Sequence, residues 1–443
     1  MSNETKNKVV PKLRFPEFKN ERGWNVEPLG EVYSFKTTNS FSRDNLNYEV
    51  GDVKNIHYGD IHTKFSPLFD ITKERVPFIN PSISIERINS ECYCVEGDMI
   101  FADASEDLKD VGKSIEIVNL NNEKLLSGLH TLLARQKKSK LIIGFGSHLF
   151  ASDAIRIQIQ REAQGAKVLG ISANRLSEIK IYHPENKLEQ QKIADCLSSL
   201  DELITAQSQK LQTLKAHKKG LMQQLFPAEG ETVPKLRFAE FKDSGEWDEK
   251  QLGNMTEKVG SGITPLGGEA NYKKSGKPFV RSQNVGWGIF LVDDIAYIDE
   301  KTHQDSISTE INKEDVLLNI TGASIGRSAV ADSFVHGGNV NQHVCIIRTV
   351  KNILNPFFLN QYLISINGQK QIDSFQAGGN RQGLNFAQIR SFSIPVPPTI
   401  EEQQKIADCL SSLDEQISAQ TEKIEALKIH KKGLMQALFP SEL

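Results

Sequence analysis

The fourteen residues EQQKIADCLSSLDE stand at positions 189–202 and again at positions 402–415, with no difference between the two copies. The likeness continues to HKKGLMQQLFP at 217–227 and HKKGLMQALFP at 430–440. Chance does not produce so long an identity, so the chain contains an internal duplication. The proline near the end of each copy is expected to stop a helix, because proline cannot continue one.

A second, shorter repeat precedes each copy: residues 11–18 read PKLRFPEF and residues 234–241 read PKLRFAEF. The block between the two motifs is ten residues longer in the first half, and the two blocks are little alike. The chain therefore alternates variable and fixed parts. We expect a first globular domain at 11–186, a first repeated helix at 187–227, a second globular domain at 228–399 and a second repeated helix at 400–440.

Both fixed segments carry apolar residues at alternating spacings of three and four. Sustained over about five heptads, this spacing predicts a coiled-coil seam, although a stripe buried against its own domain would show it too. About 36 helical residues would span ~54 Å and could act as a spacer between the two globular domains. The predicted seam consists of Ile193, Leu197, Leu200, Ile204, Gln207, Leu211 and Leu214 in the first helix, and of Ile406, Leu410, Leu413, Ile417, Gln420, Ile424 and Leu427 in the second.

The natural partner of each fixed helix is the other copy. The intervening domain permits parallel or antiparallel pairing, and we prefer the antiparallel pair because it gives a pseudo-two-fold molecule. Gln207 and Gln420 would then meet and fix the register, as polar seam residues do elsewhere. Lys218 and Lys431 would approach the opposite helix starts near Asp408 and Asp195, or would instead extend outward into solvent.

The composition is that of an ordinary soluble protein, with 38% hydrophobic residues, 25% charged residues and a net charge of −3. No segment approaches the about 20 apolar residues of a membrane span, and the N-terminus lacks the apolar core of a secretory signal. Five cysteines form no even disulfide framework, so we expect a cytoplasmic protein. The charge balance excludes a wholly basic nucleic-acid protein but permits a local basic face.

Short strand-like runs alternate with loops and a few helical stretches in both variable blocks. We expect strands at 99–101, 129–133 and 179–183 in the first block and at 316–320, 343–347 and 392–396 in the second, with a helix at 356–366. The mixture predicts the α+β class. The predicted architecture is two globular domains separated by a long antiparallel two-helix coiled coil, with pseudo-two-fold symmetry.

Several polar segments of the variable blocks suit DNA. Arg, Gln and Asn side chains read base edges, and residues 281–284 (RSQN) follow a strand-like run, with residues 54–60 at the matching place in the first block. Basic runs and glycine-rich loops could meet phosphates, or could be solvated faces and plain turns. The candidate DNA-contacting residues are Lys54, Asn55, His57, Tyr58, Lys137, Lys138, Lys167, Arg281, Ser282, Gln283, Asn284, Asn380, Arg381 and Gln382.

Catalytic motifs are missing from the sequence. Residues 322–328 (GASIGRS) have three residues between the glycines and an arginine where a phosphate-binding loop needs lysine. No H-E-x-x-H, no G-x-S-x-G and no Asn- or Asp-Pro-Pro-Tyr motif occurs. His130 and His343 match between the repeats, and we interpret them as structural hydrogen-bonders. The pattern predicts a protein that reads DNA, with no catalytic residue and no metal site.

With these motifs the chain resembles the specificity subunit of type I restriction–modification systems over nearly its whole length. The resemblance rests on EQQKIA at 189–194 and 402–407, IPVPP at 394–398 and GASIG at 322–326. It implies two target recognition domains, each reading one half of a bipartite, asymmetric double-stranded DNA site. It also implies that the helices separate these domains and dock two methyltransferase subunits, that restriction subunits join the complex, and that S-adenosylmethionine, ATP and magnesium bind to those partners rather than to this chain.

The first domain departs from the family pattern. It lacks the GASIG loop, for which 101–105 (FADAS) stands nearby, and it has Lys167-Val168 where the second domain has Asn380-Arg381. Two alternative functions stay open. A stand-alone DNA-modifying enzyme would cleave or methylate DNA by itself, and a coiled-coil assembly adaptor would leave DNA mobility unchanged even with a methyltransferase present.

Overall fold

The computed structural model describes residues 9–265, 267–376 and 383–440, and these form two compact units. Unit 1 contains the chain up to Ala206 together with the segment from Ile424 onward, and unit 2 contains Gln207–Lys423. The predicted four-part division kept each helix separate from the domains. That division stays a prediction; by contacts, each of the two units takes in the beginning of one repeated helix and the end of the other. No helix among the described residues is long and apolar enough to cross a membrane.

Unit 1 is built around a five-stranded sheet in the order β2-β11-β7-β9-β5, with a smaller four-stranded sheet, β10-β4-β6-β3, beside it. Its strands are β1 Asn25–Pro28, β2 Tyr33–Lys36, β3 Leu46–Asn47, β4 Val53–Ile56, β5 Leu68–Asp70, β6 Phe78–Ile79, β7 Met99–Ala102, β8 Ala104–Ser105, β9 Ser114–Asn119, β10 Lys124–Ser127, β11 Thr131–Gln136, β12 Leu169–Gly170 and β13 Lys180–His183. Its shorter helices are α1 Leu29–Val32, α2 Tyr58–Thr63, α3 Phe145–Ala151, α4 Asp153–Glu162 and α5 Ala173–Glu178.

Unit 2 repeats this plan with a four-stranded sheet in the order β15-β21-β18-β19 and a three-stranded sheet, β17-β16-β20. Its strands are β14 Asp248–Gln251, β15 Thr256–Ser261, β16 Lys277–Val280, β17 Ala296–Ile298, β18 Val316–Asn319, β19 Ser328–Val330, β20 Asn339–Val340, β21 Val344–Thr349 and β22 Ser393–Val396. Its shorter helices are α7 Glu300–Asp305, α8 Pro356–Leu363, α9 Ile366–Ser374 and α10 Phe386–Arg390. The α+β class is confirmed, and each predicted strand overlaps an observed one.

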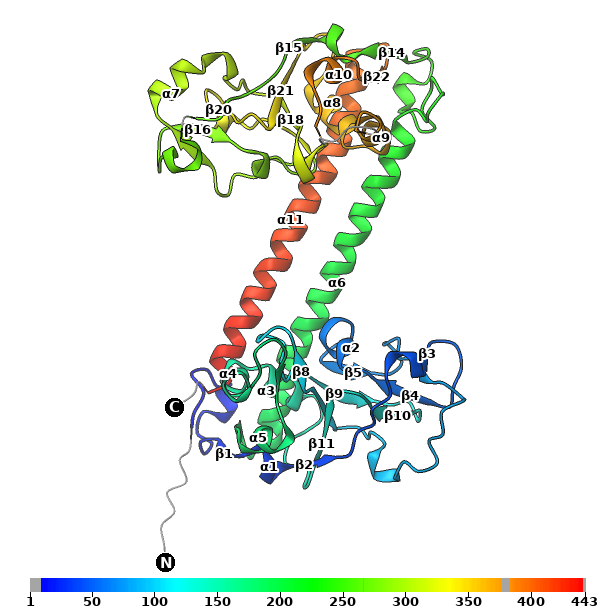
Figure 1. The fold of residues 1–443 in the computed structure, drawn as a ribbon, viewed down its shortest axis with the longest axis vertical. Helices are drawn as coiled ribbons and strands as arrows, with labels where there is room; N and C mark the ends of the chain where they lie inside the picture. Colours follow the sequence, from blue (N-terminus) through cyan, green and yellow to red (C-terminus); the bar gives the residue numbers. More distant parts are fainter. Residues whose placement is uncertain (1–8, 266, 377–382, 441–443) are drawn as a thin grey trace, which may run out of the picture. The chain divides into compact units, whose positions relative to one another are not determined.

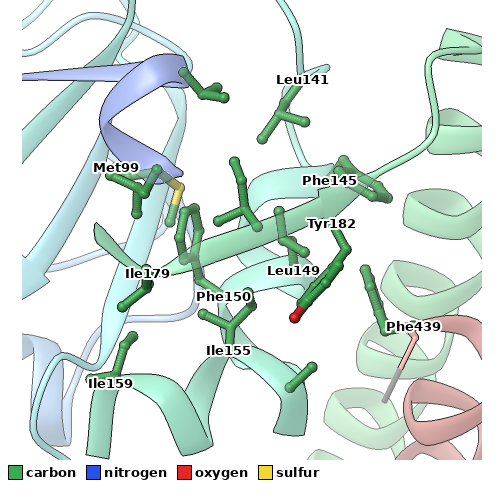
Figure 2. Packing of buried hydrophobic residues seen from close by; sticks show 14 of the residues in the cluster. Met99, Leu141, Phe145, Leu149, Phe150, Ile155, Ile159, Ile179, Tyr182 and Phe439 are labelled. Atoms are coloured by element: carbon green, nitrogen blue, oxygen red, sulfur yellow. The ribbon is translucent and has the colours of Figure 1, made fainter. Parts of the chain in front are cut away.

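The two repeated segments are single helices, α6 Lys187–Leu225 and α11 Ile400–Leu438, drawn in green and in orange to red in Figure 1. All fourteen predicted seam residues are buried or half-buried. The start of α6 and the end of α11 enter the core of unit 1, where the Phe439 ring lies 5.7 Å from the Phe145 ring (Figure 2). The end of α6 and the start of α11 enter the core of unit 2 in the same way. The predicted seam residues therefore pack between the two helices in the middle part of each helix, and against the globular part of a unit at the helix ends.

A buried ion pair anchors the start of each long helix and explains why two separate motifs are repeated together. In unit 1, Arg14 of PKLRF donates two hydrogen bonds to Glu189 in the first turn of α6, at 2.7 and 2.6 Å. In unit 2, Arg237 binds Glu402 at 2.7 and 2.8 Å. The side chains of all four residues are less than a tenth exposed, and a paired guanidinium and carboxylate satisfy each other's hydrogen bonds.

The same two motifs also tie each helix end to its domain. The amide of Gln190 donates to two carbonyl groups and accepts from the Ile142 N–H, and Gln403 contacts the Ile353 carbonyl and the Asn355 N–H in the same way. The backbone N–H of the leucine in each PKLRF motif donates to a carbonyl near the end of the other long helix, Ala437 in unit 1 and Gln224 in unit 2. A carbonyl in the last turn of a helix has no partner within the helix, so this contact satisfies it.

Within each unit the segments of α6 and α11 run antiparallel, as predicted. In unit 2, the Gln420 side chain donates to Gln207 Oε1 at 2.8 Å, and Lys218 binds Asp414 at 2.6 Å. In unit 1 the equivalent Lys431 binds Asp201. The expected partners Asp408 and Asp195 were wrong, and so was the solvated alternative for these lysines. Each lysine reaches an aspartate six positions further along the partner helix than predicted, because helix side chains lean toward the N-terminus of their own helix.

We expect the double variant Gln207→Cys/Gln420→Cys to form a disulfide under mild oxidation, because the two side chains already touch. Non-reducing electrophoresis after proteolysis between the two sites would detect it. The matched control Gln207→Cys/Thr421→Cys places the second thiol on the exposed face and should not crosslink. An intact fold with no bond in the first variant would reject the observed register.

We expect Glu402→Ala to destabilise unit 2 by about 3–5 kcal/mol, because it leaves the buried Arg237 guanidinium without its counter-ion. Urea unfolding of the full chain would measure this as an earlier first transition. Lys192→Ala is the control, since it removes a pair with Glu17 whose side chains are each about half exposed and which should contribute at most about 1 kcal/mol. Equal losses in the two variants would contradict the anchoring role.

Candidate nucleic-acid interface

The same corner of the main sheet gathers polar side chains in both units. In unit 1 this corner lies where β7 ends and β11 begins, and in unit 2 it lies where β18 ends and β21 begins. Just before these second strands, His130 Nδ1 lies 3.2 Å from Asp103 Oδ1, and His343 Nδ1 lies 2.5 Å from Thr321 Oγ1. A later loop is fixed to the corner in each unit, through the pairing of Gly170 with Ala104 and of Gly383 with Thr321.

In unit 1 the corner is aromatic and partly exposed. The Tyr58 ring lies 5.3 Å from the His130 ring and 4.7 Å from the His57 ring, and about half of the His130 side chain is exposed. Burial, followed by the positive charge of Arg43, lowers the pKa of His57. Exposed Lys167 lies two residues before β12, which pairs beside this corner. The group offers flat rings and hydrogen-bonding edges, both of which bind bases.

In unit 2 the corner carries amide and hydroxyl groups instead. Gln342 contacts the Thr264 hydroxyl, and its Nε2 lies 3.2 Å from His343 Nε2. The Thr264 segment approaches very closely, since a Cβ on Gly262 would lie 1.5 Å from the Val340 carbonyl oxygen. Only glycine fits there. The two corners therefore share a position in the fold and differ in chemistry.

Comparison with known proteins identifies the family. A family model described as the type I restriction modification DNA specificity domain matches residues 21–216 and 244–428. The chain belongs to this family. Two copies of one specificity domain match the duplication found in the sequence.

Individual relatives of this specificity family agree over the full length. A Methanocaldococcus jannaschii protein, provisionally named the type I restriction enzyme MjaX specificity subunit, is 24% identical over 432 residues, which is 95% of this chain and 93% of that protein. The crystal structure of the type I restriction–modification S subunit from M. genitalium matches 98% of this chain and 100% of its own, with a TM-score of 0.62 and 15% identity. A chain solved in work on complex assembly and conformational transition of the type I system matches 95% and 98%, with a TM-score of 0.53 and 17% identity. At such identities the structural likeness concerns the fold alone.

Two predicted base-reading asparagines of this specificity-family chain are internal. Asn55 is fully buried in β4 and accepts a hydrogen bond from the Asn39 amide at 2.7 Å. Asn284 is fully buried and holds the loop after it, through the carbonyls of Leu291 and Asp293. A side chain without exposed atoms cannot meet a base edge, so the expectation was wrong for both. A single buried polar residue in a short strand or turn leaves no periodic signal in the sequence.

Three other candidates are already engaged within their own unit. Lys54 binds Glu123 at 2.6 Å and is about one-seventh exposed. Arg281 lies over the Tyr272 ring and donates to Asp294, to which Gln283 also donates. These contacts hold the side chains beside an exposed carboxylate. Ser282 is half-buried in the same turn.

The basic residues of the first domain between positions 135 and 140 lie at the end of β11 opposite His130. Lys137 and Lys138 are exposed there, and Lys137 donates to the Gly30 carbonyl at 2.5 Å. Arg135 and Lys140 instead serve internal ion pairs with Asp98 and Glu27. The remaining candidates Asn380, Arg381 and Gln382 lie outside the described residues. Exposed Thr264 and Gln342 were not among the candidates.

One carboxyl group has the pKa of a general acid but not the position of one. Burial raises the pKa of Glu116 to about 7, although its carboxylate accepts the backbone N–H groups of Ser147 and Gly144. The residue is 1% exposed in the core of unit 1, so no substrate can reach it. Within the described parts of the chain, no three His, Cys, Asp or Glu side chains gather as a metal site would require.

We expect Glu116→Gln to change how stability depends on pH. The folded-state pKa is raised above the ordinary value of 4.5, so the stability that this group contributes is fully present at low pH and is lost as pH rises from about 4.5 to about 7. Glutamine does not ionise and should remove this loss. Relative to the wild type, the variant should gain roughly 2 kcal/mol between pH 5 and pH 8, measured by urea unfolding. A pH-independent difference between the two proteins would contradict the assignment.

Proposed function

We propose that this chain is the DNA-recognition subunit of a type I restriction–modification complex, in which each unit reads one half of a bipartite site. The observation that carries the proposal is the contrast between identical anchors and different corners. The ion pair, the glutamine contacts and the helix pairing recur residue for residue in both units, whereas the corners present rings in one and amides in the other. A repeated set of helix anchors that carries different polar corner residues in each unit suits the recognition of two different half-sites.

The reading residues that we propose follow the exposed corners. In unit 1 they are Tyr58, His130 and Lys167, and in unit 2 Thr264, Gln342 and His343. His57 is 7% exposed and packs against the Tyr58 ring, so it is not among them. Lys137 and Lys138, at the far end of β11, would contact phosphates rather than bases. Such contacts add affinity that depends on salt, without sequence preference.

The paired helices, in this proposal, bind two methyltransferase subunits, and restriction subunits join that core. Methyl transfer and cleavage would take place on those partners, with S-adenosylmethionine, ATP and magnesium bound there. The chain itself would be non-catalytic. The duplication supports two copies of the methyltransferase, because a repeated surface binds a repeated partner.

We expect Tyr58→Ala and Gln342→Ala to alter opposite halves of the recognised sequence. Loss of a base contact typically removes about 1–3 kcal/mol of discrimination, so each variant should relax one or two positions in its own half-site. Mapping methylated sites across the genome of cells that carry each variant would show both half-sites. A site that stays unchanged in both variants, or relaxes in both halves at once, would contradict the assignment of one half-site to each unit.

Two further controls separate this function from its alternatives. Tyr58→Phe keeps the ring and should keep the site if stacking dominates. The purified chain should neither methylate nor cleave DNA, and together with methyltransferase subunits it should retard a duplex that contains the mapped site. Modification by the chain alone would support an independent enzyme, and no retardation of the duplex would support an adaptor.

A further inference from the structure

Each unit contains a groove beside the end of one long helix, and the two grooves use equivalent helix residues. The groove of unit 2, about 580 Å³, lies between the end of α6 and the start of α9. The groove of unit 1, about 390 Å³, lies between the end of α11 and the start of α4. The shared lining is Lys215, Lys218, Lys219, Met222 and Gln223 in unit 2 and Lys428, Lys431, Lys432, Met435 and Gln436 in unit 1.

Internal packing explains only part of this repetition. Lys218 and Lys431 have their aspartate partners, but Lys219 and Lys432 are exposed in their units. An exposed lysine is not required by the fold. Its recurrence in both copies, in a chain whose globular parts have diverged, indicates a shared external partner.

The chemistry of the grooves defines that partner. In unit 2, Met222, Phe226 and Ile364 form an apolar floor, and lysines stand along the rim. Such a surface complements an amphipathic helix with apolar anchors and acidic flanks. The partner proposed above, the methyltransferase subunit, would have to present such a segment once in each copy.

The walls supplied by the globular parts make the two grooves unequal. Ile364 and Ile366 line the groove of unit 2, whereas Ala151 and Asp153 occupy the equivalent positions in unit 1. The groove of unit 2 also contains Lys370 and Glu229, which lie 3.7 Å apart, and the groove of unit 1 contains Asp153 and Asp201. The lining of unit 2 is the more positive, with four lysines and one carboxylate against three lysines and two carboxylates in unit 1. An acidic, apolar segment gains more contact area and less repulsion in unit 2.

A tryptophan near the groove of unit 2 extends this difference. Trp287 is about half exposed, in the turn between the paired residues Val285 and Phe290. The next residue, Gly288, lies so close to Ile364 that a Cβ there would be 2.8 Å from its side chain. Exposed tryptophans at the edge of an apolar groove are frequent anchors of protein interfaces.

We propose that the two grooves are docking sites of unequal strength for an acidic amphipathic segment of the methyltransferase subunit, and that the unit 2 groove fills first. This inference rests on the proposed function. It adds an order of assembly, in which a complex with one methyltransferase on unit 2 precedes the complex with two. The half-site read by unit 1 would gain its methyltransferase last.

The test uses the full chain, the purified methyltransferase subunit of the same system and native mass spectrometry over a range of concentrations. We compare Lys215→Glu/Lys219→Glu with the equivalent change Lys428→Glu/Lys432→Glu. The first variant should weaken the first binding step by about tenfold or more. The second should leave the first step unchanged and weaken only the second. Trp287→Ala should weaken the first step alone, and the surface position of these residues keeps the fold intact.

The possible results separate the two proposals. Two equal binding steps in the wild type, equal effects of the matched variants, or no effect of either would overturn the inference while leaving the proposed function in place. No binding of the methyltransferase to the wild-type chain would overturn the proposed function itself. Loss of the first step only in the unit 2 variants would support the order of assembly.

Discussion

The buried pairing of an arginine in each PKLRF motif with the glutamate that opens each EQQK segment fixes the rest of the structure. A bidentate ion pair of this kind has one geometry, and it is expensive to break because either partner alone would be an unpaired buried charge. It joins the beginning of a long helix to the beginning of its globular part. The leucine before the arginine then binds the last turn of the other long helix. One short motif thereby sets the position of two helix ends.

This arrangement makes each unit depend on distant parts of the chain. The core of unit 1 includes Leu438 and Phe439, more than 400 residues from Trp24, whose ring lies 5.9 Å from the Phe439 ring. The core of unit 2 is completed in the same way by the end of α6. A contact between such remote segments tolerates little change, whereas the sheet edges farther from the helices are free to vary. These different constraints explain why the residues that anchor the helices are the same in both units while the polar residues of the corners differ.

The corners show how the same frame can support different recognition. His130 and His343 hold corresponding places, yet one faces a carboxylate and a tyrosine ring and the other a threonine hydroxyl and a glutamine amide. The prediction that both histidines form structural hydrogen bonds agrees with the observed partners. Their partial exposure leaves both available for the proposed contact with DNA. For the grooves, in contrast, the helix residues are constant and the globular walls differ, so the duplication itself makes the two grooves similar but unequal.

The sequence alone determined the duplication, the two long helices, the α+β class and the polar contact between Gln207 and Gln420, because these depend on local periodicity and on identity between copies. It did not give the partners of Lys218 and Lys431, since a long helix side chain leans toward the N-terminus of its own helix and so reaches a residue further along the antiparallel partner. It also could not show that Asn55 and Asn284 are internal or that Gln342 is exposed, because a single polar residue in a short strand or turn has no periodic pattern that reveals its burial. Only the tertiary structure decided which polar side chains remain available to DNA, because that depends on contacts between segments far apart in the chain.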